Sequence, residues 1–109
     1  MITVSIERKQ RKITSFTITG HAESGPYGHD LVCAAVSAVS FGTVNAIEAL
    51  CNIEPDVELR NNGGYLKVIA PSEVEENTNK SIQLLLEGMV VSLQTIERDY
   101  HEYIQMIEV

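Results

Sequence analysis

Three side chains near the start of the chain are suited to chemistry: Cys33 and the two histidines that precede it, His21 and His29. Histidine changes charge near neutral pH, so it can take the proton of a thiol. A cysteine with a histidine is the smallest arrangement that supports nucleophilic acyl transfer. A structural role for Cys33 is the alternative, because free cysteine is among the most buried residue types and most helix cysteines only pack.

The predicted position of Cys33 in a helix favours the chemical interpretation. Residues Leu31 to Ile47 carry no charge and predict a core helix that continues to about Cys51, with Asp30 at its N-cap. Cys33 would lie in the first turn, where unpaired N–H groups and the helix dipole favour a thiolate and could hold an oxyanion. Asp30 could instead orient a histidine, although its charge would oppose thiolate formation. Ser37, one turn after Cys33, either faces the same cleft or serves helix packing.

The segment from Gly20 to Asp30 predicts a mobile loop, because it is rich in glycine and has no apolar periodicity. Its glycines give hinge freedom, and Tyr27 could contact a substrate. Such a loop either closes over a bound chain and excludes water or is an ordinary surface loop. His21 closes the preceding strand on a firmer scaffold than His29, which mildly favours His21 as the base. No paired metal-ligand spacing is present, so metal binding fits less well.

Alternating apolar and polar residues predict strands elsewhere in the chain. Residues 2–7 and 14–18 alternate, and the basic run between them predicts the turn of a hairpin. Residues 56–61 and 64–69 alternate around Asn62-Gly63, a strong hairpin signal. An apolar face between Ile82 and Ile96 predicts a long helix, for which Ser72 and Glu75 could form a capping box. Residues 103–109 predict either a last strand or the continuation of that helix.

The order ββαββα, with or without a closing strand, predicts an α+β fold. We expect an antiparallel or mixed sheet of four to five strands with two helices on one face. Several strands carry apolar residues on both faces, for example Ile13 with Phe16 and Tyr65 with Leu66. A homodimer would cover that apolar excess.

The chain has 109 residues and a formal net charge of −7, which fits a single domain over 1–109. Fifteen acids against eight bases argue against nucleic-acid binding and favour a basic partner. Four of the eight bases lie between Arg8 and Lys12, which predicts a solvated turn. The alternative is that the rest of the surface, which is then strongly acidic, is suited to a basic partner. Cys33 and Cys51 are too few for a disulfide framework, and Cys51 is interpreted as structural. With no signal-peptide pattern, no expected membrane span and no expected cofactor, the chain predicts a cytoplasmic protein.

Two blocks of sequence, Gly20–Ala22 (GHA) and Gly28–Ala38 (GHDLVCAAVSA), resemble the ribosomal-processing cysteine protease family called Prp. The resemblance continues through 41–47, 61–64 and 89–96 and covers nearly the whole chain. By position, the family's histidine matches His21, its nucleophile matches Cys33, and Asp30 matches a motif aspartate. The remaining positions that match or adjoin the loop gating the site are Gly20, Ala22, Gly25, Tyr27, Gly28 and His29. The match is loose at 23–27 and in the C-terminal tail.

The resemblance implies a small α+β homodimer with a histidine–cysteine dyad, and we expect Asp30, from its match to the motif, and Ser37, from its helical spacing, to support that dyad. Its substrate would be the precursor of a large-subunit ribosomal protein, whose short N-terminal extension carries an aromatic pair just before the cut. Removal of the extension would serve ribosome maturation. The alternative hypothesis is a non-catalytic dimeric binding module or chaperone for a basic ribosomal protein, which the acidic surface fits equally well.

Overall fold

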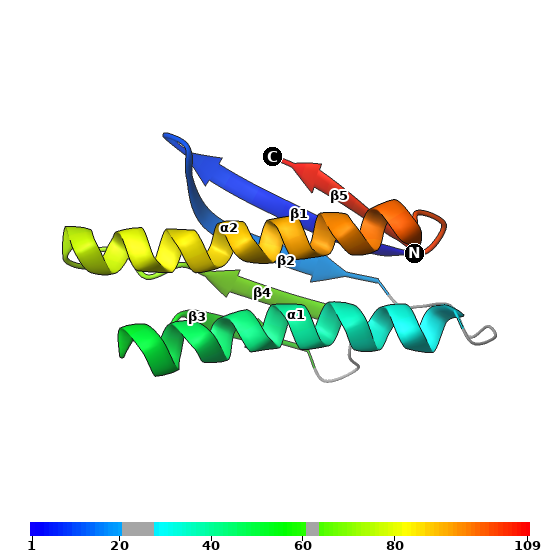
Figure 1. The fold of residues 1–109 in the computed structure, drawn as a ribbon, viewed down its shortest axis with the longest axis horizontal. Helices are drawn as coiled ribbons and strands as arrows, with labels where there is room; N and C mark the ends of the chain where they lie inside the picture. The colour runs from blue at the N-terminus through cyan, green and yellow to red at the C-terminus, as the bar shows by residue number, and fades with distance from the viewer. Residues whose placement is uncertain (21–27, 61–63) are drawn as a thin grey trace.

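The computed structural model describes residues 1–20, 28–60 and 64–109. Its elements are, in chain order, β1 (Ile2–Lys9), β2 (Lys12–Thr19), α1 (Gly28–Cys51), β3 (Asp56–Leu59), β4 (Tyr65–Ile69), α2 (Glu76–Asp99) and β5 (Ile104–Glu108). The predicted order is confirmed, and the closing segment is a strand. Both helices lie on one face of a single five-stranded sheet, so the molecule has two layers (Figure 1).

The sheet has the strand order β3-β4-β2-β1-β5 and is mixed. Its first four strands pair antiparallel, whereas β5 pairs parallel with β1. A parallel neighbour cannot be reached through a tight turn, so α2 serves as the connection that brings the chain back to this edge. The Met106 N–H donates to the Glu97 carboxylate at 2.7 Å, which fixes β5 to the end of α2.

The hairpin of β1 and β2 has a shorter turn than the basic run predicted. Arg8, Lys9 and Lys12 lie in the strands, and the turn consists of Gln10 and Arg11 alone. Both turn residues have positive φ, at 52° and 70°, which is the geometry of a type I′ hairpin.

A β-bulge in this hairpin overturns one part of the predicted apolar excess. The register passes from Glu7–Ser15 to Arg8–Ile13, so Thr14 is an additional residue in β2. An additional residue reverses the alternation of side chains beyond it. Ile13 and Phe16, which were assigned to opposite faces, are therefore both buried in the core, each with 1% of its surface exposed.

Two adjacent rows of the sheet show how its faces differ. The row Met106–Val4–Ile18–Leu66–Leu59 faces the helices and is apolar. The row Ile107–Ser5–Thr17–Lys67–Glu58 faces away from the helices and is polar except for Ile107 at its edge. The outer face therefore needs less cover than the sequence suggested.

Helix α1 buries one face and ends where it was expected to end. Val32, Val36, Val44 and Ile47 are each no more than 5% exposed and belong to the core. After Cys51, Asn52 adopts a φ of 56° and its N–H donates to the Glu48 carbonyl, an ending typical of asparagine. By length and composition alone, Leu31–Cys51 is long and apolar enough to cross a membrane, as the core helix of a soluble protein also is.

Helix α2 begins without the predicted capping box. Glu75 occupies the N-cap and makes no side-chain capping hydrogen bond, while Ser72 lies outside the helix. The predicted apolar face is confirmed, with Ile82, Leu86 and Leu93 wholly buried. The Gln83 amide both donates to and accepts from the main chain of Ile13, which ties α2 to β2.

Candidate active site

Cys33 lies in the second turn of α1, and the prediction that it lies in the first turn is wrong. The helix begins at Gly28, so Asp30 is its third residue rather than its N-cap. The N–H groups without an intrahelical acceptor are the first four, at residues 28–31. The effect of the helix dipole also falls off within the first turn. Activation of Cys33 therefore depends more on a neighbouring base than the sequence suggested.

The Cys33 side chain lines a cavity of about 230 Å3 between α1 and the sheet. Helix α1 contributes Cys33, Val36, Ser37, Ser40 and Phe41, and the remaining lining residues are Ile2, Ile18, Gly20, Leu59, Gly64, Tyr65 and Leu66. Ser40 is buried and its hydroxyl donates to the Val36 carbonyl at 2.8 Å, so this polar group is already satisfied. The cavity is consequently apolar, with a thiol and the Ser37 hydroxyl in its wall, and it suits an apolar side chain of a ligand.

The thiol of Cys33 is half-buried and free, and it packs against the edge of the core. Cys51 is also half-buried, free and packed against the core, but it lies at the last residue of α1, away from this cavity. Ser37, one turn after Cys33, lines the same cavity as the thiol. The helix thus presents one thiol and two hydroxyls to the cavity, of which the Ser40 hydroxyl is already hydrogen-bonded, and it keeps the other cysteine elsewhere.

Two glycines with positive φ lie side by side in the cavity wall. Gly20 follows β2 with a φ of 97°, and Gly64 precedes β4 with a φ of 71°. The Gly20 N–H donates to the Gly64 carbonyl at 3.0 Å. This hydrogen bond joins the chain just before residue 21 to the chain just after residue 63.

Several predicted site residues lie outside the part of the chain that the structure describes. They are His21, Ala22, Gly25 and Tyr27. For Gly28, His29 and Asp30 the structure gives a helical backbone only. Of the predicted site residues, the structure therefore brings Gly20, Cys33 and Ser37 to one cavity.

The sequence reasoning missed the apolar wall of the cavity. Phe41 lies two turns after Cys33 on α1, and the helical spacing could have indicated that it faces the same way. Leu59 and Tyr65 flank the Asn-Gly turn, so the hairpin signal could have placed them together but not beside α1. The ring of Tyr65 also carries the Arg60 guanidinium, 3.9 Å from its centroid.

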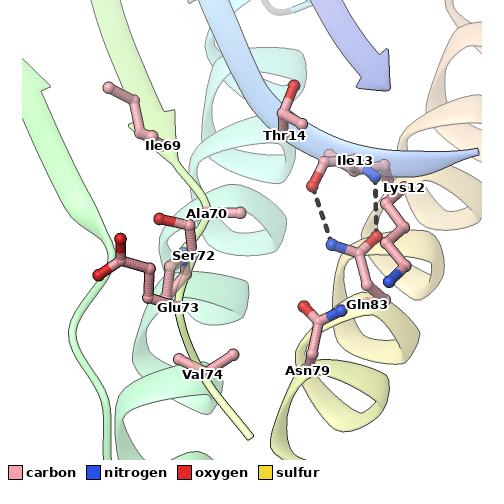
Figure 2. A pocket seen from close by; sticks show the side chains of 11 residues that line it. Lys12, Ile13, Thr14, Ile69, Ala70, Ser72, Glu73, Val74, Asn79 and Gln83 are labelled. Carbon is pink, nitrogen blue, oxygen red and sulfur yellow. Dashed lines mark hydrogen bonds between the residues drawn. The ribbon is translucent and has the colours of Figure 1, made fainter. Parts of the chain in front are cut away.

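A second cavity, of about 330 Å3, lies near the hairpin-tip end of β2 (Figure 2). The Gln83 amide in its wall is already paired with Ile13, as the dashed lines in Figure 2 show. Asn79 and Lys12 lie beside it, and no cysteine or histidine is among the residues that line this cavity. Of these two cavities, the one that Cys33 lines is therefore the candidate active site.

No group of three or more histidine, cysteine or acidic residues gathers as a metal site within residues 1–20, 28–60 and 64–109. His101 is exposed in the turn between α2 and β5. An α+β domain with a half-buried free thiol in the wall of an apolar cavity fits a cysteine hydrolase whose substrate is a peptide with an apolar side chain.

Comparison with known proteins identifies the family of cysteine hydrolases to which this chain belongs. The family model described as "Cysteine protease Prp" matches residues 1–105, and the chain belongs to this family. The chain is 45% identical to the ribosomal processing cysteine protease Prp of Bacillus subtilis, over 97% of this chain and 96% of that protein. Crystal structures of the ribosomal processing protease Prp from S. aureus match all of this chain and all of that one. The complex with a covalently linked product peptide has a TM-score of 0.86 at 44% identity, and the complex with a substrate peptide has a TM-score of 0.86 at 42% identity.

Proposed function

We propose that this protein is an endopeptidase that removes the short N-terminal extension of a large-subunit ribosomal protein precursor. The observation that carries the proposal is the free Cys33 thiol in the wall of an apolar cavity, in a chain that matches the Prp family across residues 1–105. The relatives named as ribosomal processing proteases, one of them bound covalently to a product peptide, support the same assignment.

In the proposed mechanism His21 takes the proton of Cys33, and the sulfur attacks the scissile carbonyl carbon. The unpaired N–H groups at the start of α1, which lie about one turn before Cys33, stabilise the oxyanion. His21 then gives the proton to the leaving amine, which departs and leaves a thioester. Water hydrolyses the thioester, and the thiol is restored. Asp30 and Ser37 support the dyad rather than react.

The apolar cavity is proposed to hold a side chain of the substrate next to the cut. Its volume of about 230 Å3 and its wall of Ile2, Phe41 and Leu66 suit an aromatic ring better than a charged group. An aromatic pair just before the cut would place one ring there. A peptide in which alanine replaces the aromatic pair should therefore be cleaved with a lower kcat/KM than the natural peptide.

The test of the proposed function is mass spectrometry of a candidate ribosomal precursor before and after incubation with the protein. The wild-type protein and the Cys51→Ala variant should both remove the extension, whereas Cys33→Ala should not. Processing by Cys33→Ala at the wild-type rate would refute the mechanism. Binding of the precursor by the wild-type protein without any cleavage would favour the alternative, a non-catalytic binding module or chaperone.

We also propose that the protein is a homodimer and that the outer face of the two helices forms the interface. Leu84 and Val91 of α2 are 74% and 62% exposed on this face, and Leu31 of α1 is 58% exposed. Residues 31–47 carry no charge, so two copies of a chain with a net charge of −7 can meet there with little repulsion. A contact of this kind would cover apolar surface that is costly to leave in water.

Sedimentation of the wild-type protein against Leu84→Glu tests the dimer. Gln105→Glu introduces the same amino acid at an exposed position of β5, away from the two helices, and is the control for added charge. We expect Leu84→Glu to sediment as a monomer and Gln105→Glu to sediment like the wild type. A monomeric wild type at high concentration would contradict the proposal.

We also propose that the protein works in the cytoplasm. Both cysteines are free, as expected in a reducing compartment, and the acidic net charge suits a basic substrate.

A further inference from the structure

The backbone at Gly20 is held in a conformation that only glycine adopts easily. Its φ of 97° lies in the region that L side chains rarely occupy. A Cβ at this position would also collide with the carbonyl oxygen of Met1. Two separate restraints, backbone angle and lack of space, therefore require glycine here.

The same residue is tied to the other side of the cavity. The Gly20 N–H donates to the Gly64 carbonyl at 3.0 Å, and both glycines line the cavity together with Cys33. Gly64 is itself at positive φ, 71°. The hydrogen bond thus joins the start of the β2–α1 connection to the end of the β3–β4 connection.

The next residue in the chain is His21, which the proposed function assigns as the base. Since consecutive Cα atoms are about 3.8 Å apart, the direction of the chain at Gly20 determines where His21 can begin. We propose that Gly20 is a positioning residue for the dyad, which acts by fixing the point and direction at which the chain leaves β2 toward His21. This inference rests on the proposed function.

The test compares Gly20→Ala with Ile6→Val, a variant of a core residue that is 1% exposed and does not line the cavity. Both variants lower stability, but only Gly20→Ala should displace His21. We expect kcat on the precursor peptide to fall roughly 100-fold in Gly20→Ala, the loss that a displacement of about 1 Å can cause, with a smaller change in KM. Ile6→Val should keep kcat within about twofold while it unfolds at a lower temperature.

Alkylation of Cys33 as a function of pH separates positioning from simple damage to the fold. The profile of Gly20→Ala should coincide with that of His21→Ala, and the double variant should add no further change to His21→Ala. Ile6→Val should keep the wild-type profile. Wild-type kcat in Gly20→Ala would overturn the inference, and so would an unchanged alkylation profile or an effect that adds fully to that of His21→Ala.

If Gly20→Ala does not fold, the inference is tested at Gly64, which accepts the hydrogen bond from the Gly20 N–H. Asparagine tolerates positive φ better than alanine does, so Gly64→Asn should keep more activity than Gly64→Ala by at least tenfold. Equal activity of these two variants would overturn the inference. Cys33→Ala, measured in the same cleavage assay, distinguishes failure of this inference from failure of the proposed function, because an active Cys33→Ala removes the proposed function itself.

Discussion

The Arg8 guanidinium should stabilise the fold by a modest amount that depends on pH. Its Nη1 and Nη2 atoms donate to the two carboxylate oxygens of Glu87 at 2.5 and 2.9 Å, and its Nε atom donates to Glu108 at 3.2 Å. Arg8 thereby joins β1 to α2 and β5. The Glu87 side chain is still 43% exposed, so solvent screens much of the attraction. We expect Glu87→Gln to lower the free energy of unfolding by about 1 kcal/mol at pH 7, because the pair is bidentate.

The pH dependence follows from the direction of the pKa shift. The hydrogen bond from Arg8 lowers the pKa of Glu87 from its ordinary value of 4.5, against the opposing effect of desolvation. A carboxyl group with a lowered native pKa contributes its full stabilisation above the unfolded value and loses it as the pH falls through the native value. The difference between the wild type and Glu87→Gln should therefore be constant above pH 4.5 and disappear well below it.

Thermal or urea unfolding of both proteins across this pH range is the assay. A loss of 1 kcal/mol corresponds to a decrease in Tm of about 4–8 °C for a domain of this size. Glu76→Gln is the control, because Glu76 lies in the same helix, is 84% exposed and is 3.9 Å from Lys80. Its loss should stay below about 0.5 kcal/mol. Equal losses in the two variants, or a Glu87→Gln deficit that persists in acid, would refute the reasoning.

Three further predictions concern the site. Leu59→Ala should raise KM for the precursor peptide about threefold and leave kcat unchanged, as expected when a partly exposed apolar wall is trimmed; a fall in kcat alone would contradict a binding role. Peptide mapping after brief treatment with iodoacetamide at neutral pH should find the label on Cys33 rather than Cys51; preferential labelling of Cys51 would argue against an activated Cys33. Raising the salt concentration should lower kcat/KM for the basic precursor more than for a short neutral peptide, and equal sensitivity would show that net charge does not steer the substrate.

The order and type of the elements could be read from the sequence because they depend on local pattern. Strict alternation in residues 2–7 and an uncharged helix from Leu31 leave few alternatives. The bulge at Thr14 could not be predicted, since it depends on how β1 and β2 align with α2. The start of α1 was misplaced by three residues: Asp30 is a good cap by type and would begin the helix at Leu31, but the helix begins at Gly28.

The chemistry of the site was easier to predict than its walls. Cys33 and Ser37 were identified from residue type and spacing and Gly20 from the resemblance of its segment to the Prp family, and the structure brings them to one cavity. Leu59 and Gly64 were not identified, because their closeness to α1 is a tertiary contact. It arises only when β4 pairs with β2 and carries β3 beneath the helix. Pairing across the sheet, not spacing in the chain, determines which apolar residues face the thiol.

The basic hairpin tip lies far from the cavity that Cys33 lines, so the net charge of −7 is unevenly distributed. Arg8 is paired with the carboxylates of Glu87 and Glu108, so the cations left at the hairpin tip are Lys9, Arg11 and Lys12. The tip and Gly20 lie at opposite ends of β2, whose eight residues span about 26 Å. This is about three times the Debye length of roughly 8 Å at physiological salt, so the tip cannot neutralise the field around the cavity. Nearer the cavity, Glu58 of β3 precedes Leu59 of the wall and lies opposite Lys67 of β4, which offsets part of its charge. A basic substrate of the kind we propose would therefore be attracted by the net charge of the whole chain rather than by β3 alone.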